Sequence, residues 1–274
     1  MRGPAVSLGL LLLAGCGGGG PPPIRGAKKI ESAPQPTAFS LPTDPSPAAS
    51  DPAAKAVIDA ALKAHTDGQP GKLDALRTAR KTVAGSLTGP AGKVANEWKF
   101  TWRWPDRWRT EMVVAGRPPV VIRRVGSAAW IAVPGAGEQP ISGSSLTGVQ
   151  AETFAECLLV LFPLTDPAAV FGPAAGTSVR GKPAVGVRVS GPGWPTAVLH
   201  FDPDTKRLVQ ASYAGSEGNV GTTKEVIVLA EKAVAGVTLP ERMEIRWDGQ
   251  EKGDWTLKDI QFPLAVEDKL FDRP

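Results

Sequence analysis

Several residue types and motifs are scarce in this chain of 274 residues. It contains 2 cysteines and 2 histidines, and no cysteine or third histidine stands near His65 or His200. A disulfide-stapled fold is therefore excluded, and a zinc site built from three or four such ligands is disfavoured. We also find no Gly-x-Ser-x-Gly elbow and no phosphate-binding loop. The sequence thus predicts no catalytic residues, no metal ligands and no cofactor.

Charge of one sign is not concentrated anywhere in the chain. Lys+Arg 31 against Asp+Glu 27 gives a net charge of +4, spread along the sequence. A nucleic-acid binder would carry a basic cluster, so we expect no nucleic-acid partner. Asp202 and Asp204 lack the other ligands of a calcium loop and indicate a turn.

Long hydrophobic runs are absent too. The longest stretch, Ala5–Ala14, follows Arg2 and holds about 10 residues, too few to cross a bilayer, so residues 1–15 are expected to be a signal peptide. It ends in Leu-Ala-Gly-Cys, which resembles the bacterial lipobox. The resemblance implies cleavage before Cys16, a diacylglycerol thioether on its sulfur and a fatty acyl group such as palmitate on its amine. The alternative is an ordinary signal peptide with a chance cysteine.

The segment after Cys16 is rich in proline and glycine. Residues 16–50 comprise the lipidated cysteine and a tether of 34 residues from Gly17 to Ser50, a composition that cannot bury enough apolar surface to fold. Fully extended, the tether would reach on the order of 100 Å. Gly17 in place of Asp resembles the sorting signal for the outer membrane. With Cys16 lipidated, Cys157 has no partner in the chain and is expected to be an inert buried thiol.

The stretch Glu97–Val114 carries the strongest pattern. Trp98, Phe100, Trp102 and Trp104 alternate with charged or polar residues, which places four large rings on one face of a strand. After Pro105-Asp106 the alternation resumes, so we expect a hairpin with one very apolar face. A helix or a ligand must cover that face.

The other elements follow from local signals. Asp51 should cap a helix over Ala53–His65, and His65 should interact with that helix's terminal carbonyls. A short helix is expected at Leu73–Lys81, and an apolar helix at Val149–Phe162 after a capping box at Thr147–Gln150. Asp166-Pro167 should cap a further short turn that runs to Phe171. We expect a polar loop over Gly135–Ser145. Besides the hairpin, strands are predicted at Thr82–Leu87, Pro119–Val125, Ala128–Val133, Ala184–Ser190, Thr196–Asp202, Leu208–Ala214, Lys224–Ala230, Glu241–Trp247 and Trp255–Phe262.

Element order and three motifs carry a family resemblance over residues 53–274. The motifs are Phe100–Arg109 (FTWRWPDRWR), Leu199–Leu208 (LHFDPDTKRL) and Gly236–Pro240 (GVTLP). They resemble the LolA/LolB-like lipoprotein-localisation family, with the RseB-like sensors. The resemblance implies a mainly β fold: a strongly curved antiparallel sheet of about eleven strands, forming an incomplete barrel whose concave face is covered by N-terminal and inserted helices.

The same resemblance implies candidate ligand residues. A concave face that holds acyl chains would be lined by aromatic and aliphatic side chains of the hairpin and of the inserted helix: Trp98, Phe100, Trp102, Trp104, Phe154, Leu158 and Phe162. Alternatively these residues are ordinary core beneath the helix. Arg109 matches the family's hairpin arginine, which helps to close the lid, although it also fits a plain solvated face.

Together these patterns predict one folded domain, residues 51–274, of a lipid-anchored protein of the bacterial envelope, on the periplasmic side of the outer membrane. It would be a non-enzyme that binds a hydrophobic ligand, such as an acyl chain or the lipid of a lipoprotein, in lipoprotein sorting. The alternatives are a structural or signalling module that binds an envelope protein, and a hydrolase with an unrecognised site.

Overall fold

A computed structural model describes residues 49–89, 92–217, 220–262 and 265–272 of the chain. The expected signal peptide, Cys16 and all of the tether up to residue 48 lie outside the described residues. No helix in the described part is long and apolar enough to cross a membrane.

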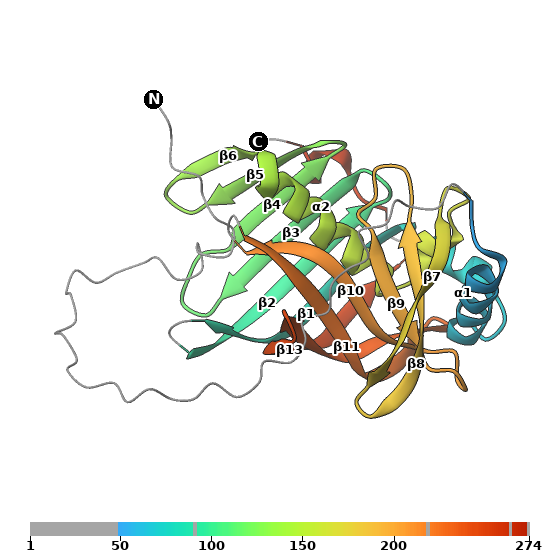
Figure 1. Ribbon diagram of the computed structural model, residues 1–274. Coiled ribbons are helices and arrows are strands. Elements are labelled where there is room, and N and C mark those ends of the chain that lie inside the picture. Colours follow the sequence, from blue (N-terminus) through green and yellow to red (C-terminus); the bar gives the residue numbers. More distant parts are fainter. Residues whose placement is uncertain (1–48, 90–91, 218–219, 263–264, 273–274) are drawn as a thin grey trace, which may run out of the picture.

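One antiparallel sheet of 13 strands dominates the described residues (Figure 1). The first six strands form one meander: β1 (Thr78–Gly89), β2 (Gly92–Arg103), β3 (Arg107–Val114), β4 (Val120–Val125), β5 (Ala128–Val133) and β6 (Gly137–Ile141). The last seven form another: β7 (Val170–Val179), β8 (Lys182–Ser190), β9 (Ala197–Phe201), β10 (Leu208–Glu217), β11 (Val220–Val234), β12 (Val237–Trp247) and β13 (Gln250–Gln261). Their order is β6-β5-β4-β3-β2-β1-β13-β12-β11-β10-β9-β8-β7, so β1 and β13 join the two meanders.

The mainly antiparallel, incompletely closed sheet is confirmed, but the expected number of eleven strands is two too low. The two strands that the sequence did not indicate, β6 and β7, are the two edges of the sheet. The expected loop over Gly135–Ser145 is therefore wrong, because β6 lies within it. Both edges contain proline or glycine, which weakens a strand pattern and is tolerated where one side of the strand lacks a neighbour.

Two glycines permit the close pairing of β1 with β13. A Cβ atom on Gly85 would lie 1.8 Å from the carbonyl oxygen of Asp254, and one on Gly253 would lie 1.9 Å from that of Ser86. Since real Cβ atoms do not approach that closely, any larger residue would push the strands apart at this crossing.

The N-terminal helix α1 (Pro52–His65) begins as predicted: the Asp51 carboxylate accepts a hydrogen bond from the Ala54 amide at 2.8 Å. The second expected helix is wrong in type and length. A 3-10 helix, η1 (Pro70–Arg77), ends four residues before Lys81, and β1 starts at Thr78. The reason is tertiary, because β1 pairs with both β2 and β13 and this pairing overrides local helix propensity.

The inserted helix α2 (Gly143–Leu158) starts earlier than the expected Val149 and stops before Phe162. Ser142 is its N-cap residue, so Thr147 lies inside the helix and the predicted capping box is wrong. The helix ends four residues before the expected Phe162. Leu161 then adopts a left-handed conformation, and a short 3-10 turn, η2 (Phe162–Thr165), follows.

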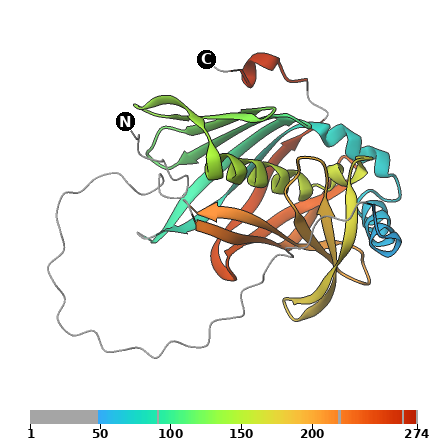
Figure 2. The same ribbon diagram turned by 45° about the horizontal axis from the view of Figure 1, so that its top comes forward.

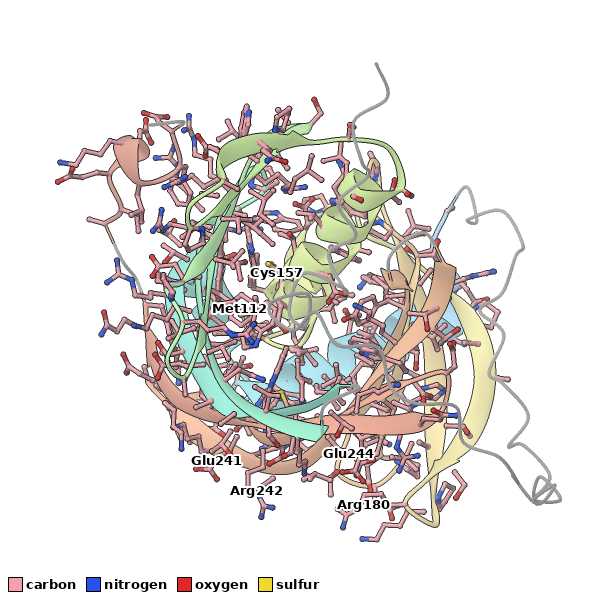
Figure 3. All side chains as sticks on the ribbon, turned by 90° about the vertical axis from the view of Figure 1, so that its left-hand side faces the viewer. Met112, Cys157, Arg180, Glu241, Arg242 and Glu244 are labelled. Atoms are coloured by element: carbon pink, nitrogen blue, oxygen red, sulfur yellow. The ribbon has the colours of Figure 1, made fainter. Side chains whose placement is uncertain are left out.

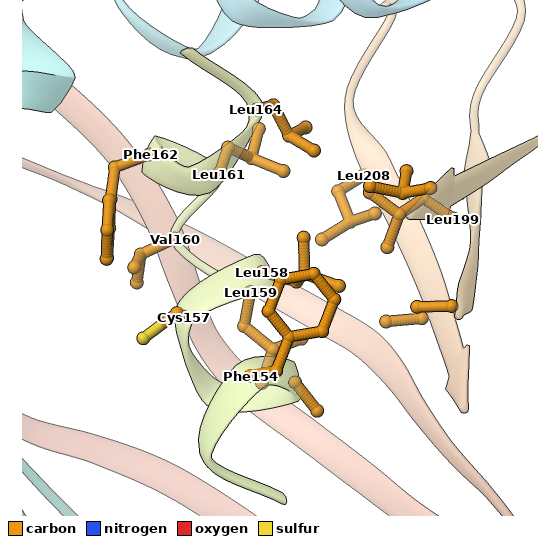
Figure 4. Packing of buried hydrophobic residues seen from close by; sticks show 14 of the residues in the cluster. Phe154, Cys157, Leu158, Leu159, Val160, Leu161, Phe162, Leu164, Leu199 and Leu208 are labelled. Carbon is orange, nitrogen blue, oxygen red and sulfur yellow. The ribbon is translucent and has the colours of Figure 1, made fainter. Parts of the chain in front are cut away.

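Seen end-on, the sheet curves around α2 (Figure 3). Figure 2 shows the same helix lying between the green strands of the first meander and the orange and yellow strands of the second. The main apolar core fills the space between the concave face and the second half of α2. In Figure 4, Phe154 and Leu158 lie between Phe162 on one side and Leu199 and Leu208 on the other. Helix α2 thus supplies the cover that the aromatic face requires.

His65 does not act as expected. Instead of serving the carbonyls of its own helix, it joins α1 to two strands: its Nδ1–H donates to the Thr238 carbonyl at 3.0 Å, and its Nε2 accepts from the Leu208 amide at 3.0 Å. This pattern requires a neutral ring, and burial lowers the pKa of His65 to about 4.

We therefore expect mild acid to destabilise the domain through His65. Between pH 6.5 and 4 the unfolded chain binds a proton at His65 that the folded chain does not bind. The contribution of neutral His65 to the free energy of unfolding is therefore fully present above pH 6.5 and is lost as the pH falls toward 4. The loss should reach roughly 2 kcal/mol by pH 5. Burial also lowers the pKa of His200, which adds a loss in the same direction.

Urea unfolding at pH 7.5 and pH 5 would measure this loss. His65→Gln should be less stable at pH 7.5 and show a smaller difference between the two pH values. An unchanged difference would contradict the role of His65.

Candidate ligand cavity between the aromatic face and helix α2

The aromatic residues of β2 do point to one face, but they divide into two groups. Trp102 is buried in the core: its indole N–H donates to the Leu76 carbonyl at 2.7 Å, and its ring stacks on Trp108 with centroids 5.4 Å apart. Trp98 and Phe100 lie further along the strand, where the core opens, and stack on each other at 6.1 Å. The face is therefore packed at one end and open at the other.

A cavity of about 140 Å³ occupies the open end, beneath α2. It lies between strands of both meanders, and most of its wall is aromatic or aliphatic. Residues from eight strands and α2 line it: Leu87, Trp98, Phe100, Trp108, Thr110, Ile122, Ser145, Gly148, Val149, Glu152, Thr153, Glu156, Tyr213, Lys224, Val226, Ile245, Trp247 and Trp255. We call this space the main cavity.

The structure places the other predicted ligand residues elsewhere. Leu158 and Phe162 are fully buried in the core, with Phe162 stacked on Trp102 at 6.4 Å. Trp104 and Phe154 line a second space of about 180 Å³ on another side of α2, which also contains Trp194. Of the seven candidates, Trp98 and Phe100 alone border the main cavity.

Arg109 lies away from α2. Its neighbours on β3, Trp108 and Thr110, line the main cavity, so alternation directs Arg109 to the convex face. There its Nε–H donates to Glu111 at 2.9 Å. The geometry shows no contact between Arg109 and the covering helix.

Other charged residues hold α2 to the sheet. Glu156 and Lys81 of β1 form an ion pair with side chains 8% and 4% exposed, and the Lys81 ammonium lies 5.1 Å from the Phe100 ring centroid. One helical turn earlier, Glu152 pairs with Lys224 of β11 and accepts a hydrogen bond from the Tyr213 hydroxyl at 2.8 Å. These contacts join one face of α2 to both halves of the sheet.

Burial and charge raise the pKa of two nearby groups. Burial, reinforced by the negative charge of Glu152, holds the pKa of Tyr213 well above its ordinary value, so the phenol stays protonated and donates to that carboxylate. Burial also raises the pKa of the Cys157 thiol, which is the property of an inert buried thiol. Neither group is activated as a nucleophile.

The sequence reasoning missed this polar set, although a signal for it was present. Glu152 and Glu156 are two carboxylates one turn apart in an otherwise apolar helix, and buried carboxylates need partners. Lys81 was assigned to the end of a helix, whereas η1 ends at Arg77 and Lys81 lies in β1. A search for basic residues on the concave strand positions would have found Lys81 and Lys224.

Among the described residues, no group of three or more His, Cys, Asp or Glu side chains is placed to hold a metal ion. His65 is hydrogen-bonded through its two ring nitrogens to Thr238 and Leu208. The Nε2 atom of His200 lies 3.3 Å from the Ala175 carbonyl oxygen.

The comparisons with known proteins define the class of fold. The structure is similar to that of a LolA superfamily protein from Nitrosomonas europaea, with a TM-score of 0.55 and 14% identity over 80% of this chain and 97% of the other. It is also similar to a DUF1329 family protein from Desulfovibrio piger, with a TM-score of 0.51 and 13% identity over 80% of this chain and 97% of the other. No family model matches the sequence, and a search of curated proteins finds no match. The LolA-like fold that the motifs predicted is thus confirmed.

The buried ion pair gives a test of how α2 is held. Lys81→Met leaves the Glu156 carboxylate buried without its partner, which should cost about 3–5 kcal/mol of unfolding free energy. Adding Glu156→Leu should recover most of the loss, because no buried charge then remains. Denaturant unfolding measures both.

Lys99→Met is the matched control, because Lys99 pairs with Glu97 at the surface, with side chains 45% and 40% exposed. It should cost under about 1 kcal/mol. Equal losses for Lys81→Met and Lys99→Met would show that the buried pair does not hold α2.

Proposed function

We propose that this protein binds a hydrophobic ligand, an acyl chain or the lipid of a lipoprotein, in the main cavity of its half-barrel, and that it does so without catalysis. The observation that carries this proposal is the cavity between the aromatic face and α2, in a LolA-like fold. Its wall combines Trp98 and Phe100 of one meander with Trp247 and Trp255 of the other. Such largely apolar, concave spaces with a few polar groups are typical ligand sites.

The polar groups suit a ligand with a polar end. Trp255 lines the main cavity, and its indole N–H has no hydrogen-bond partner within the described ranges. A carbonyl oxygen such as that of an acyl ester would give this buried donor a partner. Lys224 also borders the cavity, with its ammonium 4.8 Å from the Trp247 ring centroid. An ester or an acidic group would be placed there, with the hydrocarbon against Phe100 and Trp108.

The main cavity is small for a long acyl chain. Its volume of about 140 Å³ is below the roughly 300–1,000 Å³ of typical ligand pockets, so it suits part of an acyl chain better than a whole one. We infer that α2 is a cover whose displacement admits the rest of the chain. That movement would separate Glu152 from Lys224 and Glu156 from Lys81, so these side chains would change partners.

We further propose that the domain is anchored at the envelope face of the outer membrane through lipid on Cys16, with the tether as spacer, and that it acts in lipoprotein sorting. The lipobox-like Leu-Ala-Gly-Cys and the proline-rich sequence after it support the anchor. Two or three acyl chains hold a protein to a membrane far more firmly than one.

A cavity-filling substitution tests ligand binding. Val226 is 3% exposed and borders the main cavity, so Val226→Trp should fill it and weaken binding of a fluorescent fatty acid at least tenfold. Ile245→Phe fills less and should weaken binding several-fold. Native mass spectrometry of the purified full chain should also detect a bound lipid in the wild type and less in both variants.

Val185→Trp is the control, because Val185 is 40% exposed on the surface. It should bind the probe as the wild type does. Thermal unfolding confirms that each variant is folded. Wild-type binding by a folded Val226→Trp, or no bound lipid and no probe binding in the wild type, would rule out the main cavity as the site.

The anchor is tested separately. Cys16→Ala should move the protein from the membrane fraction to the soluble fraction, because the acyl chains are lost, whereas Cys157→Ala should remain with the membrane. Continued membrane association of Cys16→Ala would contradict the lipid anchor.

A further inference from the structure

The second space beside α2 has a composition of its own. It is an aromatic pocket of about 180 Å³, formed by Trp104 after β2, Phe154 of α2 and Trp194 in the β8–β9 loop. The ring centroids lie 5.4 Å apart for Trp104 and Trp194, and 5.1 Å for Phe154 and Trp194. Trp104 and Trp194 are half-buried, so their rings remain accessible. Grooves lined by such rings bind proline-rich segments in polyproline II conformation.

Arg124 of β4 adds a charge to this aromatic pocket. One of its terminal nitrogens donates to the Pro105 carbonyl at 2.8 Å, while its buried Nε has no hydrogen-bond partner in the part of the chain that the structure describes. Asp106 borders the same space but is exposed. A ligand that brings a carboxylate to the terminal nitrogens of Arg124 would add a charge-assisted hydrogen bond there.

The start of the domain at Asp51 is linked to this pocket through the β7–β8 pair. The Asp51 amide donates to the Phe171 carbonyl at 2.8 Å, and Phe171 lies opposite Val189 in the β7–β8 pair. Two residues after Val189 comes Gly191, against which the Trp194 ring packs so closely that a Cβ there would lie 2.5 Å from it. The path from Asp51 to Gly191 therefore consists of one backbone contact, one spacing between paired strands and two residues along a strand. Together these add up to roughly 17 Å.

The sequence just before this entry point is rich in proline. Residues 41–47 read Leu-Pro-Thr-Asp-Pro-Ser-Pro, with Pro42 and Pro45 spaced as in a P-x-x-P motif and Asp44 between them. Six residues in polyproline II conformation span about 19 Å. Pro45 is six residues before Asp51, so an extended segment is long enough to span the distance to the pocket.

We propose that residues 41–47 of the tether dock in the aromatic pocket of their own chain, with Pro42 and Pro45 on the rings of Trp104 and Trp194 and the Asp44 carboxylate on Arg124. The segment is tethered, so its effective concentration at the pocket is in the millimolar range. A peptide that binds at about 0.1 mM when free would then occupy the pocket about ten to one.

Docking would have two effects. Gln150, Thr153 and Phe154 of α2 border the aromatic pocket, and Thr153 also lines the main cavity, so a docked tether adds contacts to the covering helix. It also shortens the free spacer to residues 17–40, 24 residues or about 75 Å when extended. The domain would thus stay nearer to its anchor until the segment is released.

Hydrogen exchange of the full mature chain tests this proposal. Gly193, Trp194 and the amides of residues 150–154 should exchange more slowly in the wild type than in Pro42→Ala/Pro45→Ala. Pro34→Ala/Pro36→Ala changes the same number of tether prolines outside the segment and should leave exchange as in the wild type. Equal exchange in all three chains, or an equal increase in both double variants, would overturn the proposal.

A synthetic peptide of residues 39–49 separates the remaining outcomes. It should bind Pro42→Ala/Pro45→Ala about tenfold more tightly than the wild type, whose pocket is already filled, and should fail to bind when Trp194→Ala is added. Equal affinity for the wild type and the double variant would count against docking within the chain. Protection from hydrogen exchange that falls when the wild type is diluted would also count against it, because a second copy of the chain would then fill the pocket. Neither result depends on ligand binding in the main cavity.

Discussion

The pairing of β1 with β13 is the contact on which the rest of the structure depends. It joins the first strand of the domain to the last, and turns two separate meanders into one sheet with a continuous concave face. The main cavity exists because of this pairing, since Trp98 comes from one meander and Trp247 and Trp255 from the other. Gly85 and Gly253 have no role at the cavity itself, yet they permit the approach that creates it.

The second constraint is how the concave face is covered. Apolar packing alone would allow α2 to slide or rotate, because the hydrophobic effect has no preferred direction. Glu152 and Glu156 lie on one side of the helix, and their partners Lys224 and Lys81 belong to opposite halves of the sheet. These pairs define the rotation and position of α2. They also place the most polar contacts of the cover directly against the aromatic wall.

The sequence predicted the parts of the fold that rest on local patterns. The alternation of Trp98, Phe100 and Trp102 predicted a strand with one apolar face, and the capping chemistry of Asp51 predicted the start of α1. The edge strands β6 and β7 were missed because Pro140 and Gly172 weaken the strand pattern, and the start of α2 was missed because Gly143 and its serines are typical of a loop.

The candidate site was harder to predict, for a physical reason. Residues on one face of an element share a pattern whether they border a cavity or fill a core, so Leu158 and Phe162 could not be distinguished from Trp98 and Phe100 in the sequence. That difference is set by how far α2 reaches along the sheet. Lys81, Tyr213 and Lys224 come together only through pairings between segments distant in the chain, which no local pattern records.

The way in which the chain enters the domain has a consequence for association between molecules. An edge strand offers unpaired backbone groups to any other strand. At the edge strand β7, the Ser50 hydroxyl accepts a hydrogen bond from the Phe171 amide, and the Asp51 amide donates to the Phe171 carbonyl. The end of the tether therefore occupies this stretch of the edge, and so hinders neighbouring copies from extending the sheet from one molecule to the next.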